Sequence, residues 1–130
     1  MSDETTFKGP LKDCPSSPNC VCTQATSVTA QMPAMKFEGS AAEAIQRVRK
    51  YLEKQPRCSI KSTKPNYLHA VFVTALMRFR DDVEFYADSE TSTLHFRSAS
   101  RLGYSDLGAN RKRMLKITKA LSANGFQAIS

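Results

Sequence analysis

The side chains best suited to chemistry alternate with apolar ones along two segments, 82–86 and 93–97. Such alternation predicts the two strands of a hairpin, with one apolar face and one polar face. A two-residue turn at Ser89 and Glu90 would bring the polar side chains of both strands together. That face would carry two carboxylates, a phenol, an imidazole and a guanidinium, from Asp82, Glu84, Tyr86, His95 and Arg97.

Two interpretations of this polar face compete. With this turn Asp82 lies opposite Arg97 and Glu84 opposite His95, with their Cβ atoms about 5 Å apart. In the first interpretation these are ordinary pairs on a solvated surface, which contribute little to stability. Alternatively the face lines a groove and binds an anionic ligand, with Arg97 as a bidentate anchor. Glu84 and His95 would serve as acid and base in a hydrolase-like enzyme, but no recognisable nucleophile accompanies them. We therefore favour binding over catalysis.

The segment 97–111 leaves the second strand, turns near Gly103 and enters a helix. Either Ser105 or Asp106 suits the N-cap of that helix. Asn110 falls on its apolar stripe, where a buried amide needs partners. We predict structural roles for Asp106 and Asn110, which would fix the directions of the neighbouring arginines. The predicted ligand-binding residues are Asp82, Glu84, His95, Arg97, Ser98, Ser100, Arg101, Tyr104 and Arg111.

The excess of positive charge is uneven along the chain. The 130 residues include 19 Lys and Arg against 12 Asp and Glu, a net charge of +7, and the segment 97–119 holds seven cations and one anion. Such a surplus attracts anions, whether nucleic acid, a phosphate-bearing ligand or an acidic protein, although a solvated helix face has the same pattern. Nucleic-acid binding by the last helix is therefore the second hypothesis, weakened by the scarcity of aromatic residues for base stacking.

The four cysteines are Cys14, Cys20, Cys22 and Cys58, and three of them lie in an irregular segment that contains prolines. Their spacing lacks the paired two-residue gaps of a zinc ribbon, so we predict no metal and no cofactor. Four cysteines allow three disulfide connectivities, and free thiols packed as small apolar residues are equally compatible with the sequence. A Cys14–Cys20 bridge would close a short loop, and we assign these two residues a structural role.

The segments that must position these residues indicate an α+β fold. Ser40 and Glu43 form a capping box at the start of a helix that Pro56 ends, and the run 67–77 is apolar on both faces, as in a covered central strand. The order of segments favours an antiparallel sheet of four to five strands with both helices packed on one face. We expect an irregular arm over 1–26 and a single domain over 27–130, with strands near 28–37, 58–62, 67–77, 82–87 and 93–97 and helices over 40–55 and 105–123.

Four motifs in order resemble the family catalogued as domain of unknown function 1499. They are Cys14-Pro-Ser-Ser-Pro-Asn-Cys-Val, Tyr67-Leu-His-Ala, Asp81-Asp-Val-Glu-Phe and the segment from Arg97-Ser-Ala-Ser-Arg to Asn110-Arg-Lys-Arg. The resemblance covers roughly residues 11 to 121. It implies bacterial and plastid-lineage relatives and brings no established activity, but it places a shared site within these motifs.

These observations predict a non-catalytic binding domain for an anionic small molecule or an acidic protein segment. No apolar run approaches the roughly 20 residues that cross a bilayer, and the first residues lack a basic cluster followed by an apolar core. We therefore expect a soluble protein, cytoplasmic if the chain is complete. The sequence does not indicate the oligomeric state.

Overall fold

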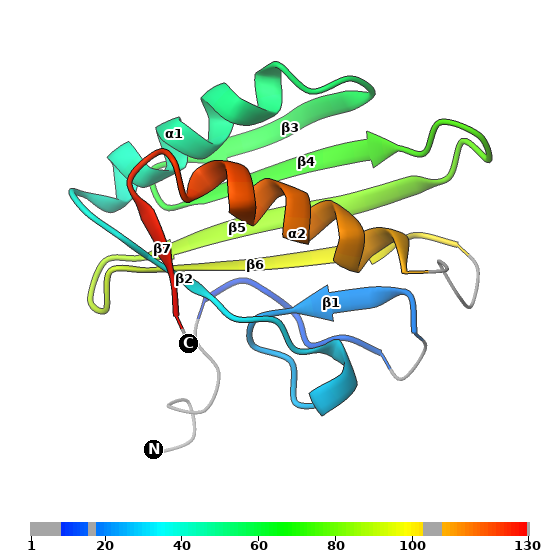
Figure 1. The fold of residues 1–130 in the computed structure, drawn as a ribbon, viewed down its shortest axis with the longest axis horizontal. Coiled ribbons are helices and arrows are strands. Elements are labelled where there is room, and N and C mark those ends of the chain that lie inside the picture. The colour runs from blue at the N-terminus through cyan, green and yellow to red at the C-terminus, as the bar shows by residue number, and fades with distance from the viewer. Residues whose placement is uncertain (1–8, 16–17, 103–107, 130) are drawn as a thin grey trace.

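The computed structural model describes residues 9–15, 18–102 and 108–129, which form seven strands, two α-helices and a 3-10 turn (Figure 1). The elements are β1 (Cys20–Cys22), η2 (Val28–Ala30), β2 (Met35–Phe37), α1 (Ala41–Glu53), β3 (Cys58–Lys64), β4 (Tyr67–Val73), β5 (Arg80–Asp88), β6 (Thr93–Ser100), α2 (Ala109–Leu121) and β7 (Phe126–Ala128). The strands make one antiparallel sheet in the order β3-β4-β5-β6-β2-β7, and β1 also pairs with β6. The α+β class is confirmed, and the expected four to five strands are corrected to seven.

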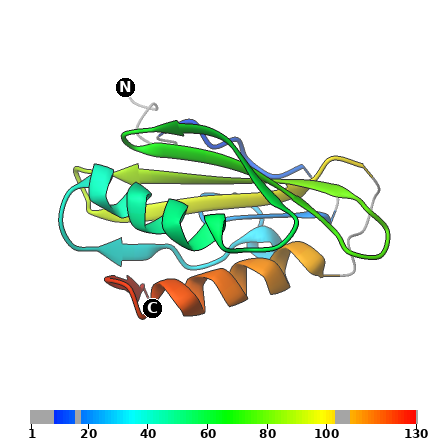
Figure 2. The ribbon, with the colours of Figure 1, turned by 90° about the horizontal axis from the view of Figure 1, so that it is seen from above.

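Both helices pack on one face of the sheet, which we call the inner face, and the opposite face is the outer face (Figure 2). The predicted capping box of α1 is present: Ser40 Oγ accepts from the Glu43 N–H at 3.1 Å, and Glu43 Oε1 accepts from the Ser40 N–H at 2.9 Å. The apolar stripe of α1 faces the sheet through Ala44, Ile45, Val48 and Leu52. Burying this stripe supplies most of the stability of such a helix.

The strands that the sequence did not predict are short. β1 and β7 have three residues each, too few for an alternating pattern, and β7 begins at Phe126, which pairs with Phe37 of β2. The apolar run 67–77 is only partly strand, because β4 ends at Val73 and the remaining residues lie in an exposed loop. Likewise 28–37 contains η2 and the short β2. α2 begins after Gly108, whose φ is +81°, and the expected cap residues 105 and 106 lie outside the described residues.

The hairpin of β5 and β6 has the predicted alternation but a different register. Four residues, 89–92, form the turn, so that Asp88 pairs with Thr93 and Glu84 pairs with Arg97. The expected pairs Glu84–His95 and Asp82–Arg97 are therefore wrong by two residues. Because an even displacement keeps each side chain on its face, the polar residues still share the outer face.

The amino-terminal arm crosses the outer face of the sheet, opposite the helices (Figure 2). Leu11 is fully buried and packs with Cys22 and with the rings of Tyr67 and Tyr86. A side chain at Gly9, whose φ is +86°, would collide with the Tyr86 ring. The arm therefore covers one end of the polar face, which the sequence had left open to solvent.

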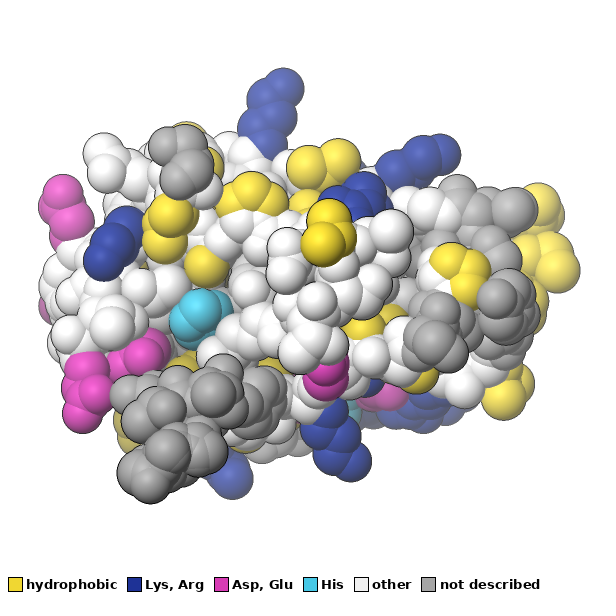
Figure 3. All heavy atoms as spheres, turned by 90° about the horizontal axis from the view of Figure 1, so that it is seen from below, with side chains coloured by type: hydrophobic (Ala, Val, Ile, Leu, Met, Phe, Trp, Pro, Cys, Tyr) yellow, Lys and Arg dark blue, Asp and Glu magenta, His cyan; other side chains and the backbone are white. Residues whose placement is uncertain are grey.

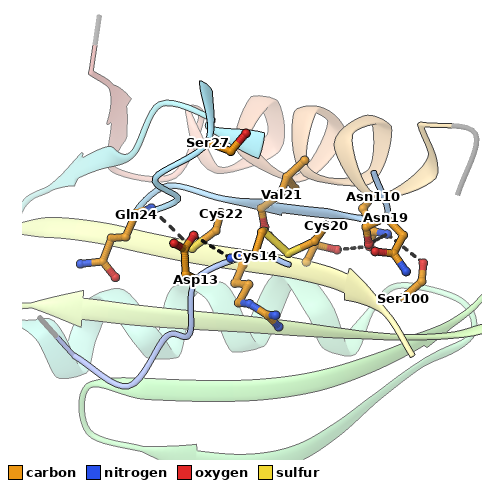
Figure 4. The surroundings of a disulfide bond; sticks show 12 residues. Asp13, Cys14, Asn19, Cys20, Val21, Cys22, Gln24, Ser27, Ser100 and Asn110 are labelled. Carbon is orange, nitrogen blue, oxygen red and sulfur yellow. Dashed lines mark hydrogen bonds between the residues drawn. A yellow bond between two sulfur atoms is a disulfide. The ribbon is translucent and has the colours of Figure 1, made fainter. Parts of the chain in front are cut away.

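A disulfide joins Cys14 to Cys20 and ties the arm to β1 (Figure 4). Cys22 is a free, buried thiol, and Cys58 is free and half-buried, with burial raising its pKa to about 11. The structure therefore forms the single Cys14–Cys20 bridge that the sequence allowed and keeps the other two cysteines as free thiols.

Reduction of this disulfide is expected to lower the free energy of unfolding by about 2 kcal/mol, because the bridge closes only a short loop. The measurement is urea unfolding with and without reductant. The double variant Cys14→Ser/Cys20→Ser should match the reduced protein and ignore the reductant. Thiol counting shows when the bridge of the wild type has been reduced. If the free energy of unfolding is then unchanged, the result contradicts this role.

Candidate functional site

The outer face gathers the predicted polar residues, and most of their charges pair with one another. Asp82 accepts from Arg101 Nε at 2.9 Å and Nη2 at 3.0 Å, and it lies 2.8 Å from His69 Nε2. The hydrogen bond from Arg101 holds the pKa of Asp82 below its usual value. Glu84 accepts from the Tyr67 hydroxyl at 2.5 Å. The Arg101 guanidinium, one of the predicted anion anchors, is thus already bound by a carboxylate of its own sheet.

Arg97 is the other predicted anchor, and its side chain is only 15% exposed. Its Nη1 lies 3.8 Å from Glu84 Oε1, too far for a hydrogen bond, and its buried Nε has no hydrogen-bond partner among the described residues. On its other side it lies opposite Cys22 of β1, whose thiol pKa is raised by burial. Arg97 is thus a largely buried cation with little open surface beside it.

His95 lies apart from Glu84 and has different partners. Its Nδ1 is 2.9 Å from Thr23 Oγ1, and its ring stacks on Tyr86 with a centroid distance of 6.2 Å. Burial lowers the pKa of His95. The acid–base pair expected from the sequence therefore lacks its geometric basis, since His95 and Glu84 are not cross-strand partners.

The lowered pKa of His95 predicts a loss of stability in mild acid. As the pH falls below the usual histidine value of 6.5, the unfolded chain takes up a proton that the folded chain resists, so the free energy of unfolding decreases. The variant His95→Gln should show a shallower decline between about pH 6.5 and pH 5 than the wild type. Urea titrations across that range measure it, and parallel curves for the two proteins would contradict the assignment.

A second polar cluster lies on the inner face, where Asn110 joins α2 to β6 and β1 (Figure 4). Ser98 Oγ donates to Asn110 Oδ1 at 2.6 Å, and Arg113 Nη1 donates to the same oxygen at 2.8 Å. Asn110 Nδ2 donates to Ser100 Oγ at 3.0 Å and to the Asn19 carbonyl at 3.1 Å. The fully buried amide thus bonds to groups of β6, of α2 and of Asn19, the residue just before β1, in keeping with the structural role proposed for it.

Arg113 completes this cluster with a buried ion pair. Its Nη2 donates to Asp81 Oδ2 at 2.6 Å, and its guanidinium carbon lies 5.0 Å from the centre of the Phe72 ring. The side chains of Asp81 and Arg113 are 1% and 12% exposed. No local pattern distinguishes Arg113 from the other cations of the segment 97–119. A signal existed for Asp81, which lies two and four residues before Val83 and Phe85 and so shares their buried face, but it was not used in the prediction.

Arg111 lies outside this cluster and contacts η2 and the residue after it. Its Nη2 donates to the Thr29 carbonyl at 2.7 Å and its Nη1 to the Gln31 carbonyl at 3.2 Å. A hollow of about 290 Å³, which we call the corner hollow, opens here between β1, η2 and the first turns of α2. Its lining comprises an apolar part, including Pro15, Pro18, Val21, Ala30 and Leu115, and a polar part of Ser27, Thr29, Arg111 and Lys112.

The structure therefore divides the predicted ligand-binding residues among three places. Alternation along β6 sends Arg97 to the outer face and Ser98 and Ser100 to the inner face. Asp82, Glu84, His95 and Arg101 lie with Arg97, and Arg111 lies at the corner hollow. Tyr104 and Asp106 fall outside the described residues. Sequence reasoning missed the contributions of Thr23, Tyr67, Lys112 and Arg113.

The fold and the polar clusters define a small α+β domain whose antiparallel sheet carries both helices on one face. Residues 10–121 match the family model described as Protein of unknown function (DUF1499), so the chain belongs to that family. This confirms the resemblance found in its four motifs. A search of curated proteins found no match to the chain.

Two negative observations hold for the part of the chain that the structure describes. Neither of its helices is long and apolar enough to pass through a lipid bilayer. No three His, Cys, Asp or Glu side chains in that part converge in a way that would hold a metal ion.

Proposed function

We propose that this chain is a non-catalytic binding domain for a small anionic molecule, and that the ligand occupies the corner hollow. The observation that carries the proposal is the composition of the wall: Arg111 and Lys112 line the hollow, and none of the described lining residues is acidic. Elsewhere the candidate cations have acidic neighbours, as Arg101 has Asp82 and Arg113 has Asp81.

The surroundings of the hollow favour an anion that carries an apolar body. The hollow lies at the first turn of α2, where helix N–H groups and the helix dipole favour negative charge, and α2 has no acidic residue in that turn. Ser27 and Thr29 add hydroxyl groups that can donate, while Pro18, Val21 and Leu115 supply apolar surface. A volume of about 290 Å³ suits a molecule of metabolite size better than a long peptide.

Lys112 provides the cleanest test, because Arg111 also holds the backbone of η2. Phenyl phosphate, a dianion with an apolar ring, is the probe, and its affinity is measured by calorimetry and by the shift in Tm. Lys112→Gln should weaken binding about fivefold, whereas Lys119→Gln, at the exposed far end of the same helix, should leave it unchanged. Equal binding by the wild type and Lys112→Gln, or no binding at millimolar probe, would overturn the proposal.

A second candidate, binding of nucleic acid, is favoured by one further observation. Lys112, Lys116 and Lys119 are all exposed and, at spacings of four and three residues, share one side of α2. Here Lys116→Gln/Lys119→Gln should reduce retention on heparin and flatten the dependence of duplex affinity on salt. Elution of the wild type at low salt would eliminate this candidate, and loss of duplex binding without loss of phenyl phosphate binding would separate it from the first.

A further inference from the structure

The loop between β4 and β5 has a fixed conformation that displays its apex. The Thr74 N–H donates to the Phe79 carbonyl at 2.9 Å, and the Arg78 N–H donates to the Thr74 carbonyl at 3.0 Å. Thr74 Oγ1 also accepts from the Phe79 N–H at 2.8 Å. These bonds close the base of the loop, which projects beyond the sheet (Figure 1). Leu76 and Met77 lie between the bonded residues Thr74 and Phe79, and we call this pair the apex.

The apex and the neighbouring Phe79 are apolar and exposed to solvent. Leu76 is 88% exposed, Met77 is 62% exposed and Phe79 is 41% exposed, which makes half of the six large exposed hydrophobic residues among those described. Hydrophobic side chains gather at this end of the molecule, on the right of Figure 3. Single exposed apolar residues are common on soluble domains, but a cluster of this kind marks a surface that contacts something else.

Three exposed arginines lie in the loop or bond to its base. Arg78 and Arg80 are exposed, and the Arg57 side chain and carbonyl both bond to the backbone of Val73. The segment 74–80 contains no acidic residue. The Arg101 N–H donates to the Arg80 carbonyl, which extends the antiparallel pairing and places Leu102, 74% exposed, next to this base. Positive charge therefore lies directly behind an apolar tip.

We propose that the β4–β5 loop docks on an anionic phospholipid surface, with its apex among the acyl chains and its arginines on the headgroup phosphates. The loop has apolar residues at its apex and cations behind them. A bilayer has the matching layers, with apolar acyl chains inside and anionic headgroups outside them. A convex tip also fits a deformable lipid surface better than the rigid groove that a protein partner would have to provide. The proposal is independent of the corner hollow, which none of these residues lines.

Flotation with vesicles tests the proposal with the full chain. The wild type should float with phosphatidylcholine–phosphatidylserine vesicles and much less with phosphatidylcholine alone, and added salt should weaken the interaction. Leu76→Ser/Met77→Ser and Arg78→Gln/Arg80→Gln should each reduce the bound fraction about tenfold. Because all four side chains are exposed, circular dichroism and Tm should stay close to those of the wild type.

Matched controls lie elsewhere on the surface. Val28→Ser removes an 80% exposed apolar side chain from η2, and Lys50→Gln removes an exposed cation from α1; both proteins should bind vesicles as the wild type does. Failure of the wild type to float with anionic vesicles, or equal losses in the loop variants and the controls, would overturn the proposal. So would self-association of the wild type that Leu76→Ser/Met77→Ser abolishes without any vesicle binding, since the loop would then contact a second copy.

Discussion

Replacing Asp81 by alanine is expected to lower the free energy of unfolding by about 3–5 kcal/mol. The substitution leaves Arg113, whose side chain is 12% exposed, without the carboxylate oxygen that lies 2.6 Å from its Nη2. A buried charge without its counter-charge retains the full cost of leaving water, and this cost is larger than the value of the pair itself. Chemical unfolding of the oxidised protein measures the change.

Two comparisons isolate this effect from the loss of a carboxylate as such. Arg49 and Glu53 form an exposed pair on α1 at 2.9 Å, and Glu53→Ala should cost only about 0.5 kcal/mol. The double variant Asp81→Leu/Arg113→Met, which removes both charges, should recover most of the lost stability. An Asp81→Ala protein no less stable than Glu53→Ala would show that the pair is not buried in solution.

Replacing Asn110 by alanine is expected to cost about 2–4 kcal/mol, because one side chain serves four partners in the buried cluster. The change removes the acceptor of the Ser98 hydroxyl and of Arg113 Nη1, and the donor to Ser100 and to the Asn19 carbonyl. It also removes a link between α2 and β1, so hydrogen exchange in β1 should accelerate more than in β4.

Asn124 provides the matched control for Asn110. Its amide donates to the Ala120 carbonyl at 3.2 Å from an exposed position at the end of α2, and Asn124→Ala should change stability by no more than about 0.5 kcal/mol. If Asn110→Ala has an equally small effect, the buried network does not hold α2 against the sheet.

The parts of the fold that the sequence predicted well depend on local signals. The capping box and apolar stripe of α1 lie within one segment, and no distant residue is needed to recognise them. The faces of β5 and β6 were also predicted correctly, because alternation alone decides them. Their register was not, since it depends on whether the turn has two or four residues, and the composition of 89–92 suits both lengths.

The elements that the sequence missed depend on contacts between distant segments. β1 and β7 have three residues each and become strands only because β6 and β2 offer free edges. The apolar run 67–77 predicted a covered strand that includes Leu76 and Met77, but these two residues are exposed. An apolar run has the same sequence pattern whether its side chains are buried or exposed. The sequence also could not predict that the arm lies on the outer face, because this position depends on the cluster that Leu11 forms with the distant residues Tyr67 and Tyr86.

The candidate site was only partly predictable for the same reason. The sequence predicted only that the arginines near this loop point in fixed directions. Alternation places Arg97 and Arg101 on the outer face, whereas the start of α2 turns Arg111 toward η2. Asn110 was correctly placed on the buried stripe of its helix, because a helical period locates it without tertiary information. The corner hollow required the packing of η2 against α2, which no local pattern encodes.

The central proposal, that the corner hollow receives a small anion, is tested most directly by following backbone amide signals during titration with phenyl phosphate. The expected result is a saturable set of shifts confined to Ser27, Thr29, Gly108, Arg111 and Lys112, which the variant Lys112→Gln weakens. Shifts centred instead on Asp82, Glu84 and Arg101 of the outer face, or none at millimolar probe, would contradict it.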